Sequence, residues 1–196
     1  MNVEEKNARI ALAVQTIDDA MRQLAEECSE LTQAALKYLR SFTQPYVDKE
    51  KAISNLIEEI GDVENIIAGT KAIITNRSYP DLVIDLRTKV SVSKDDMPID
   101  KAMIKLAVAS TALAQSALEY LESLTMPIAS ENAAARNLVG KIKDTEVAIG
   151  KTKLLSTITE EYPDLEDRIM TSREFKVKRW ADRIYSTRGI IINFDE

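Results

Sequence analysis

The sequence repeats itself, and this tandem duplication limits its fold more than any other feature. With an offset of 82 residues, 13 of the 26 positions in 20–45 recur as identical residues in 102–127. The frame continues through Asn55/Asn137, Leu56/Leu138, Ile60/Ile142, Asp62/Asp144 and Lys71/Lys153. We therefore expect two copies of one module, residues 1–92 and residues 97–196, joined by the linker 91–98.

Each copy is predicted to form a helical hairpin. Apolar residues recur at spacings of three and four, which is typical of helices with one packed face. In the first copy they predict one helix over 3–42, with a break near Thr16, and a second over 48–76, with a turn at Pro45. The two apolar stripes are Ile17, Met21, Leu24, Cys28, Leu31, Ala35, Tyr38 and Phe42, and Ile53, Leu56, Ile60, Val63, Ile67 and Ile74. The expected fold is all-α, with two tandem hairpins packed as an intrachain pseudo-dimeric helix bundle.

The composition narrows the class of protein. A chain of 196 residues with 45% hydrophobic residues, five Gly and five Pro is long enough for a real core and is typical of a helical protein. A formal net charge of −6 argues against a nucleic-acid polymer as the main partner. No apolar run approaches the roughly 20 residues that a bilayer span needs, so no membrane partner is expected. The single cysteine suits a reducing compartment, and we expect a cytoplasmic protein.

Two short motifs place pairs of carboxylates three residues apart on the predicted helices. Glu27 and Glu30 lie on the first helix, and Glu59 and Asp62 lie on the second. At roughly 100° per residue, both pairs have the same angular offset from their apolar stripe, and both lie at a similar distance from Pro45. Antiparallel helices would bring all four to one level. Four acids that close raise each other's pKa unless a cation joins them, so the sequence predicts a divalent metal site.

The residue types that the chain lacks indicate which metal ion the predicted site would bind. The chain has no histidine, and its only cysteine, Cys28, lies on the packed stripe, so every ligand must be an oxygen. This favours Mg²⁺ or Mn²⁺ over zinc or copper and argues against a carboxylate di-iron bundle. A base that activates water would then be a carboxylate, unless the metal itself activates the water. Glu26 and Glu27 are the candidates.

The second copy serves as an internal control on these acids. It keeps the core positions of the first copy but has lost most of the carboxylates. Glu26, Glu27, Glu30 and Glu59 correspond to Val108, Ala109, Ala112 and Lys141, whereas Asp62 matches Asp144. The fold therefore does not need those glutamates, which favours a site over a merely solvated acidic face. Two roles stay open for Lys141: an ion pair with Asp144 one turn away, or contact with an anionic substrate.

The C-terminal segment differs from the first copy because it concentrates positive charge. Its cations are Arg168, Arg173, Lys176, Lys178, Arg179, Arg183 and Arg188. With an apolar stripe of Phe175, Trp180 and Ile184, the segment predicts a helix that packs on the bundle with a solvated basic face and ends at Gly189. A second interpretation has some of the cations meeting phosphates, or Trp180 stacking on a base. The apolar tail 190–194 is expected to dock.

The two acidic motifs resemble those of a known superfamily. Glu26-Glu27-x-x-Glu30 followed by Glu59-x-x-Asp62 is similar to the signature of the all-α NTP pyrophosphatases, the MazG-like and dimeric dUTPase-like proteins. The resemblance covers residues 15–76, and residues 100–165 look like a degenerate copy. It implies that Glu27, Glu30, Glu59 and Asp62 bind Mg²⁺ and that Glu26 is a nearby acid or base.

The resemblance also implies an activity. Members of the superfamily cleave the α–β phosphate bond of a nucleoside triphosphate to give a monophosphate and pyrophosphate. Basic residues beyond the second motif, here Arg87 and Lys89, would contact the substrate phosphates. Members work as dimers or tetramers, so a homodimer of pseudo-dimers stays open. With one set of acids lost, the fused chain would carry one site.

Two other functions stay open at this level. The chain could be a helical interaction module, or a descendant of the superfamily that binds nucleotides without turning them over. It could also be a relative of phosphoribosyl-ATP pyrophosphohydrolase, which shares the fold and the motif. The sequence specifies neither the base nor the sugar of a nucleotide substrate.

Overall fold

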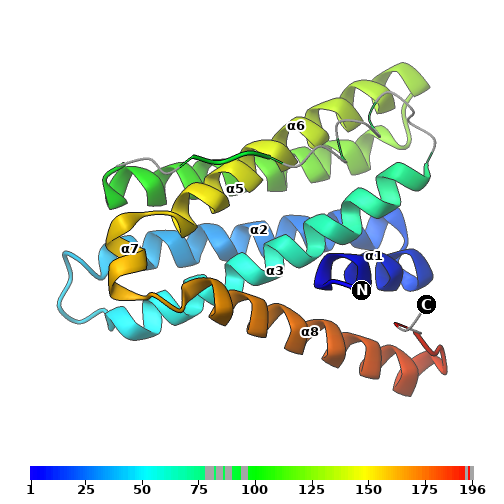
Figure 1. Ribbon diagram of the computed structural model, residues 1–196. Coiled ribbons are helices and arrows are strands. Elements are labelled where there is room, and N and C mark those ends of the chain that lie inside the picture. The colour runs from blue at the N-terminus through cyan, green and yellow to red at the C-terminus, as the bar shows by residue number, and fades with distance from the viewer. Residues whose placement is uncertain (78–81, 83–85, 87–89, 94–96, 193, 195–196) are drawn as a thin grey trace.

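The computed structural model describes residues 1–77, 82, 86, 90–93, 97–192 and 194, and within these ranges every regular element is a helix (Figure 1). The helices are α1 (Val3–Val14), α2 (Ile17–Arg40), α3 (Lys49–Asn76), α5 (Ile99–Ser123), α6 (Ile128–Lys153), α7 (Ser156–Glu161) and α8 (Leu165–Arg188). The predicted all-α class is confirmed. None of the helices in the described part of the chain is long and apolar enough to cross a membrane.

The helix boundaries follow local sequence signals. Thr16 separates α1 from α2, because its side chain accepts a hydrogen bond from the backbone N–H of Asp19 and so begins a new helix. Asp48 caps α3 in the same way through the N–H of Lys51. The break near Thr16 and the two long helices of the first copy therefore agree with the sequence pattern.

The bundle is built from two hairpins. Helix α2 packs against α3, α5 packs against α6, and the hairpins meet along α2 and α5 (Figure 1). Tyr38 and Tyr120, which occupy equivalent positions in the two copies, are both fully buried. Phe42 departs from the predicted stripe: it lies beyond the end of α2, is 41% exposed, and meets the ring of Tyr38 edge-on.

Helices α1 and α8 complete the bundle by packing on α3 and on each other. Two glycines of α3 allow this close approach. A Cβ at Gly61 would lie 3.2 Å from Cγ of Arg173 on α8, and a Cβ at Gly69 would lie 3.0 Å from Cβ of Ala11 on α1. The face of α3 that is turned away from α2 is thus shaped to accept two more helices.

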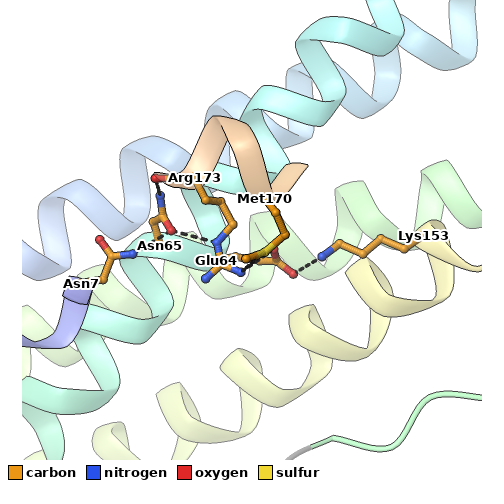
Figure 2. A network of polar contacts seen from close by, with 6 residues as sticks. All are labelled: Asn7, Glu64, Asn65, Lys153, Met170 and Arg173. Carbon is orange, nitrogen blue, oxygen red and sulfur yellow. Dashed lines mark hydrogen bonds and ion pairs between the residues drawn. The ribbon is translucent and has the colours of Figure 1, made fainter. Parts of the chain in front are cut away.

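The predicted solvated basic face of α8 is partly wrong. Arg173 is only 4% exposed and binds two residues of α3, which in turn bind α1 and α6 (Figure 2). Its Nε donates to Oδ1 of Asn65 at 2.9 Å and its Nη1 donates to Oε2 of Glu64 at 3.2 Å. Lys153 on α6 pairs with Glu64 at 2.5 Å, and Asn7 on α1 donates to Asn65 at 2.7 Å. Cations of α8 and α6 therefore compensate an acid of α3.

The structure of the C-terminal end also differs in part from the predicted apolar stripe and docked tail. Phe175 is 64% exposed, so it is not part of the apolar stripe, whereas Ile184 is buried. Gly189 ends α8 in the left-handed conformation (φ 65°), as predicted. Of the tail, Ile192 and Phe194 pack against the cluster of Val3, Ile10, Val177 and Ile184, while Ile191 is exposed. The tail therefore docks only in part, beside the N-terminus.

Several sequence predictions fall outside the described residues. Arg87 and Lys89, the expected phosphate contacts, are among them. Leu82 and Leu86 are described, and both are buried in the core.

Gly69 and Gly140 offer a matched test of this packing. Gly69→Ala should lower the free energy of unfolding by about 1–3 kcal/mol, because the new methyl group meets Ala11 at 3.0 Å and an Ala side chain has no rotamer through which to yield. Gly140→Ala should raise it by up to about 1 kcal/mol, because the space around Gly140 is open and Ala favours the helix. Urea unfolding measures both. Equal effects of the two substitutions would contradict the close packing of α1 on α3.

Candidate metal centre

The hairpin of α2 and α3 brings together three of the four carboxylates that the sequence singled out as metal ligands. One oxygen each of Glu27, Glu30 and Glu59 lies within 4.8 Å of the others. They meet because the acidic motifs of α2 and α3 have matching offsets from the two apolar stripes, and these stripes pack against each other. This juxtaposition links residues that are 29 to 32 positions apart in the sequence.

The fourth carboxylate, Asp62, lies one turn further along α3 and is engaged by a cation. Lys176 of α8 forms a close ion pair with Asp62 and a second one with Glu58 at 3.1 Å. The side chain of Asp62 is only 14% exposed, so this pair is largely withdrawn from water. The structure therefore shows three grouped acids and a neighbouring acid that a lysine neutralises.

Burial disfavours the charged form of three acids at this site. It raises the pKa of Glu27 to about 7, and the charge of Asp62 adds to this effect. Burial also raises the pKa of Glu59 to about 7, followed by the charges of Glu30 and Asp62. Burial raises the pKa of Asp62 as well, against the opposing effect of Lys176. Oε2 of Glu59 is buried and has no hydrogen-bond partner among the residues that the structure describes.

These observations fit a divalent cation. The available donors are carboxylate oxygens, which suit Mg²⁺ or Mn²⁺. A cation at this point would satisfy the buried Oε2 of Glu59 and lower the mutual repulsion of Glu27, Glu30 and Glu59. The side chain of Glu26, by contrast, lies on the exposed side of α2 and outside this group.

A pocket of about 490 Å³ opens beside the acids. One wall carries Glu27 and Asp62, from α2 and α3, and the opposite wall belongs to α8. The α8 residues that line it are Lys176, Val177, Arg179, Trp180 and Arg183. Sequence analysis left open whether the cations of the C-terminal helix are solvated or meet phosphates, and the structure places four basic or aromatic side chains of α8 around one hollow with the acids.

The equivalent position in the second copy is built differently. Lys141 pairs with Asp144 at 3.3 Å, which confirms the ion-pair interpretation of that lysine. The side chain of Asp144 is 63% exposed, whereas that of Asp62 is 14% exposed. With Ala109 and Ala112 in place of the two glutamates of α2, no group of three acids forms among the described residues there.

No family model, curated protein or solved structure matches this chain.

The acids predict an unusual dependence of stability on pH in metal-free buffer. Because the pKa values of Glu27 and Glu59 are about 7 in the folded protein against 4.5 ordinarily, the folded state holds these protons more tightly than the unfolded chain. Their contribution to the free energy of unfolding is therefore present at about pH 5 and is lost as the pH rises to about 8. The loss should be of the order of 1 kcal/mol for each acid after screening by solvent. The chain has no histidine to titrate in this window.

The substitution Glu59→Gln tests the direction of this pH dependence of stability. In EDTA at pH 8 the variant should melt at a higher temperature than the unmodified protein, and the difference should shrink at pH 5. Glu26→Gln is the matched control, because Glu26 is exposed and its substitution should change neither melting temperature. A destabilised Glu59→Gln variant at pH 8 would contradict the uncompensated burial of Glu59.

Proposed function

We propose that this protein is a Mg²⁺-dependent nucleoside triphosphate pyrophosphohydrolase that cleaves the α–β phosphate bond and releases a nucleoside monophosphate and pyrophosphate. One observation carries the proposal: a group of carboxylates suited to a divalent cation borders a pocket whose opposite wall is basic and aromatic. A nucleotide bound with its metal ion needs carboxylates for the ion, and it needs cations and an aromatic ring for its phosphates and base. The resemblance of the acidic motifs to MazG-like proteins supports the same reaction.

The acids of α2 and α3 would hold the ion. Glu27, Glu30 and Glu59 supply the grouped oxygens, and Asp62 lies beside them. A bound Mg²⁺ screens the charge of the triphosphate and polarises its phosphorus atoms. Mn²⁺ is the alternative metal, since it takes the same oxygen ligands.

The cations of α8 would bind the phosphates. Arg179 and Arg183 are exposed and line the pocket, and guanidinium groups bind phosphate oxygens in pairs. Lys176 pairs with Asp62 and would be able to bind a phosphate oxygen if Asp62 instead helped to hold the ion. In this scheme α8 contributes the contacts that sequence analysis assigned to Arg87 and Lys89.

Trp180 would face the base. It lines the pocket and is half-buried against the cluster of Val3, Ile10, Val177 and Ile184, which fixes its position. An indole ring stacks on any nucleobase, so this contact would give affinity with little selectivity among bases. We therefore expect substrate preference to be broad.

The attacking water would lose its proton to a carboxylate. Sequence analysis named Glu26 and Glu27, and only Glu27 lines the pocket. Glu26 would then act from outside the pocket, as an acid or base that neighbours Glu27 along α2.

The duplicated architecture fits one site per chain. In this proposal the hairpin of α5 and α6 takes the place of a second subunit, so the chain is a fused MazG-like pseudo-dimer whose second copy has lost its acids. A homodimer of such pseudo-dimers remains a further prediction, and sedimentation would decide it.

One observation favours a second candidate function. The close ion pair of Lys176 with Asp62 shows that an internal cation already compensates part of the acidic site. A protein that binds nucleotides on α8 without hydrolysing them, or that uses this bundle to bind another protein, would need no metal ion. Turnover separates these alternatives from the hydrolase.

The decisive experiment measures pyrophosphate release with Mg²⁺ from a panel of ribo- and deoxyribonucleoside triphosphates and from phosphoribosyl-ATP. Glu27→Gln should lower turnover by about 10²–10⁴-fold, as expected for a lost proton acceptor. Asp62→Asn should also lower turnover, whereas Asp144→Asn, at the equivalent position of the second copy, should leave it unchanged.

Circular dichroism and melting temperatures establish that each variant is folded. Absence of turnover with every substrate, or turnover that Glu27→Gln and Asp62→Asn do not affect, would contradict the hydrolase and favour the binding module. Turnover confined to phosphoribosyl-ATP would identify the specialised relative.

A further inference from the structure

Asn7, a buried amide of α1, lies in the wall of the pocket beside the acids. It is 1% exposed and lines that pocket together with Glu27 and Trp180. Its Oδ1 has no hydrogen-bond partner among the residues that the structure describes. Buried amide oxygens are almost always paired, because an unpaired one has lost its water without compensation. An unpaired acceptor in the wall of a pocket therefore indicates a donor on the molecule that fills the pocket.

The orientation of this amide is fixed by its neighbours on α3 and α8 (Figure 2). An arginine side chain can only donate, so the atom of Asn65 that meets Nε of Arg173 at 2.9 Å must be the carbonyl oxygen, Oδ1. Nδ2 of Asn65 donates to the backbone carbonyl of Arg173 at 3.4 Å, which agrees with this orientation. Asn7 must then turn its NH₂ group towards Oδ1 of Asn65, to which it donates at 2.7 Å. Oδ1 of Asn7 is left as an acceptor that is turned away from Asn65 (Figure 2).

Asn7 lies beside the indole ring that would stack on a base. On α1 it comes four residues after Val3 and three before Ile10, so these side chains share one face of the helix. Trp180 packs against the cluster that contains Val3 and Ile10, and it lines the same pocket as Asn7. We therefore expect the edge of a base that stacks on Trp180 to lie near the amide of Asn7.

The donor that best matches a recessed acceptor is an exocyclic amino group. Adenine and cytosine carry such a group, which projects from the ring and offers two N–H bonds. Hypoxanthine and uracil carry a carbonyl oxygen at the same position, and their nearest ring N–H lies beside that oxygen. A carbonyl set against Oδ1 of Asn7 would leave two acceptors facing each other, which is unfavourable. The chemistry favours an amino base over its keto counterpart.

We propose that Asn7 is a specificity-determining residue that selects nucleotides with an amino base, adenine or cytosine, over those with the corresponding keto base, hypoxanthine or uracil. Its Oδ1 accepts the hydrogen bond, and Asn65 and Arg173 hold the amide in that orientation. Stacking on Trp180 leaves the pocket open to many bases, and Asn7 adds a preference among them. The inference rests on the nucleotide pocket of the proposed function but not on hydrolysis.

Titration of the full-length chain with mononucleotides tests the proposal, with the fluorescence of Trp180 as the readout. Trp180 is the only tryptophan in the sequence and lines the pocket, so a change in its emission reports occupancy there. AMP and IMP differ in the amino or keto group of the base, and neither has an α–β phosphate bond to cleave. With Mg²⁺ present, AMP should bind at least about tenfold more tightly than IMP, a difference of ~1.4 kcal/mol. CMP should bind more tightly than UMP for the same reason.

The substitution Asn7→Leu should abolish the preference for AMP, because leucine is similar in size but has no acceptor. Its affinity for IMP should stay near that of the unmodified protein. Thr70→Val is the matched control: Thr70 is fully buried, its Oγ1 also has no partner among the described residues, and it does not line the pocket. Valine keeps the shape of threonine without the hydroxyl, so this variant should keep the preference. Melting temperatures establish that both variants are folded.

The unmodified protein alone can overturn the proposal. Binding of IMP as tightly as AMP, or no change in emission with any mononucleotide, would contradict it and leave a buried water molecule as the partner of Oδ1. Loss of the preference in Thr70→Val as well as in Asn7→Leu would also overturn it. A protein that prefers AMP but releases no pyrophosphate from any triphosphate would keep Asn7 as a specificity residue and contradict only the hydrolase.

Discussion

The burial of acidic side chains along α3 is the constraint on which the rest of the structure depends. Glu59 lies against two glutamates of α2, and burial raises its pKa to about 7. Charges in such a place must be protonated or compensated. Helix α8 compensates part of them, since Lys176 pairs with Asp62 and Arg173 pairs with Glu64. The position of α8, and with it the pocket, follows from the acids that α3 buries.

The sequence predicts those parts of the site that depend on helical period and on one turn. The spacing of Glu27, Glu30 and Glu59 relative to the apolar stripes fixes which face each occupies, and Pro45 fixes their common level. Two rules of local geometry are therefore enough to foresee their approach to within 4.8 Å. The ion pair of Lys141 with Asp144 is equally local, because it spans one turn of α6.

Contacts that depend on how α8 is rotated against the bundle could not be predicted in this way. Phe175 fits an apolar stripe by spacing but is exposed, because the buried face of α8 is centred on Arg173 and Val177. The pairing of Lys176 with Asp62 joins residues 114 positions apart. The basic run pointed to these cations, but only the packed structure shows which of them meet the acids and which line the pocket.

The central claim is that Glu27, Glu30 and Glu59 hold a divalent cation. Anomalous diffraction from crystals grown with Mn²⁺ tests it most directly, because it locates the ion without reference to activity. We expect one peak among these three carboxylates, within the ~2.0–2.6 Å that oxygen ligands keep from hard divalent cations. A peak elsewhere on the chain, or none at millimolar Mn²⁺, would contradict the claim.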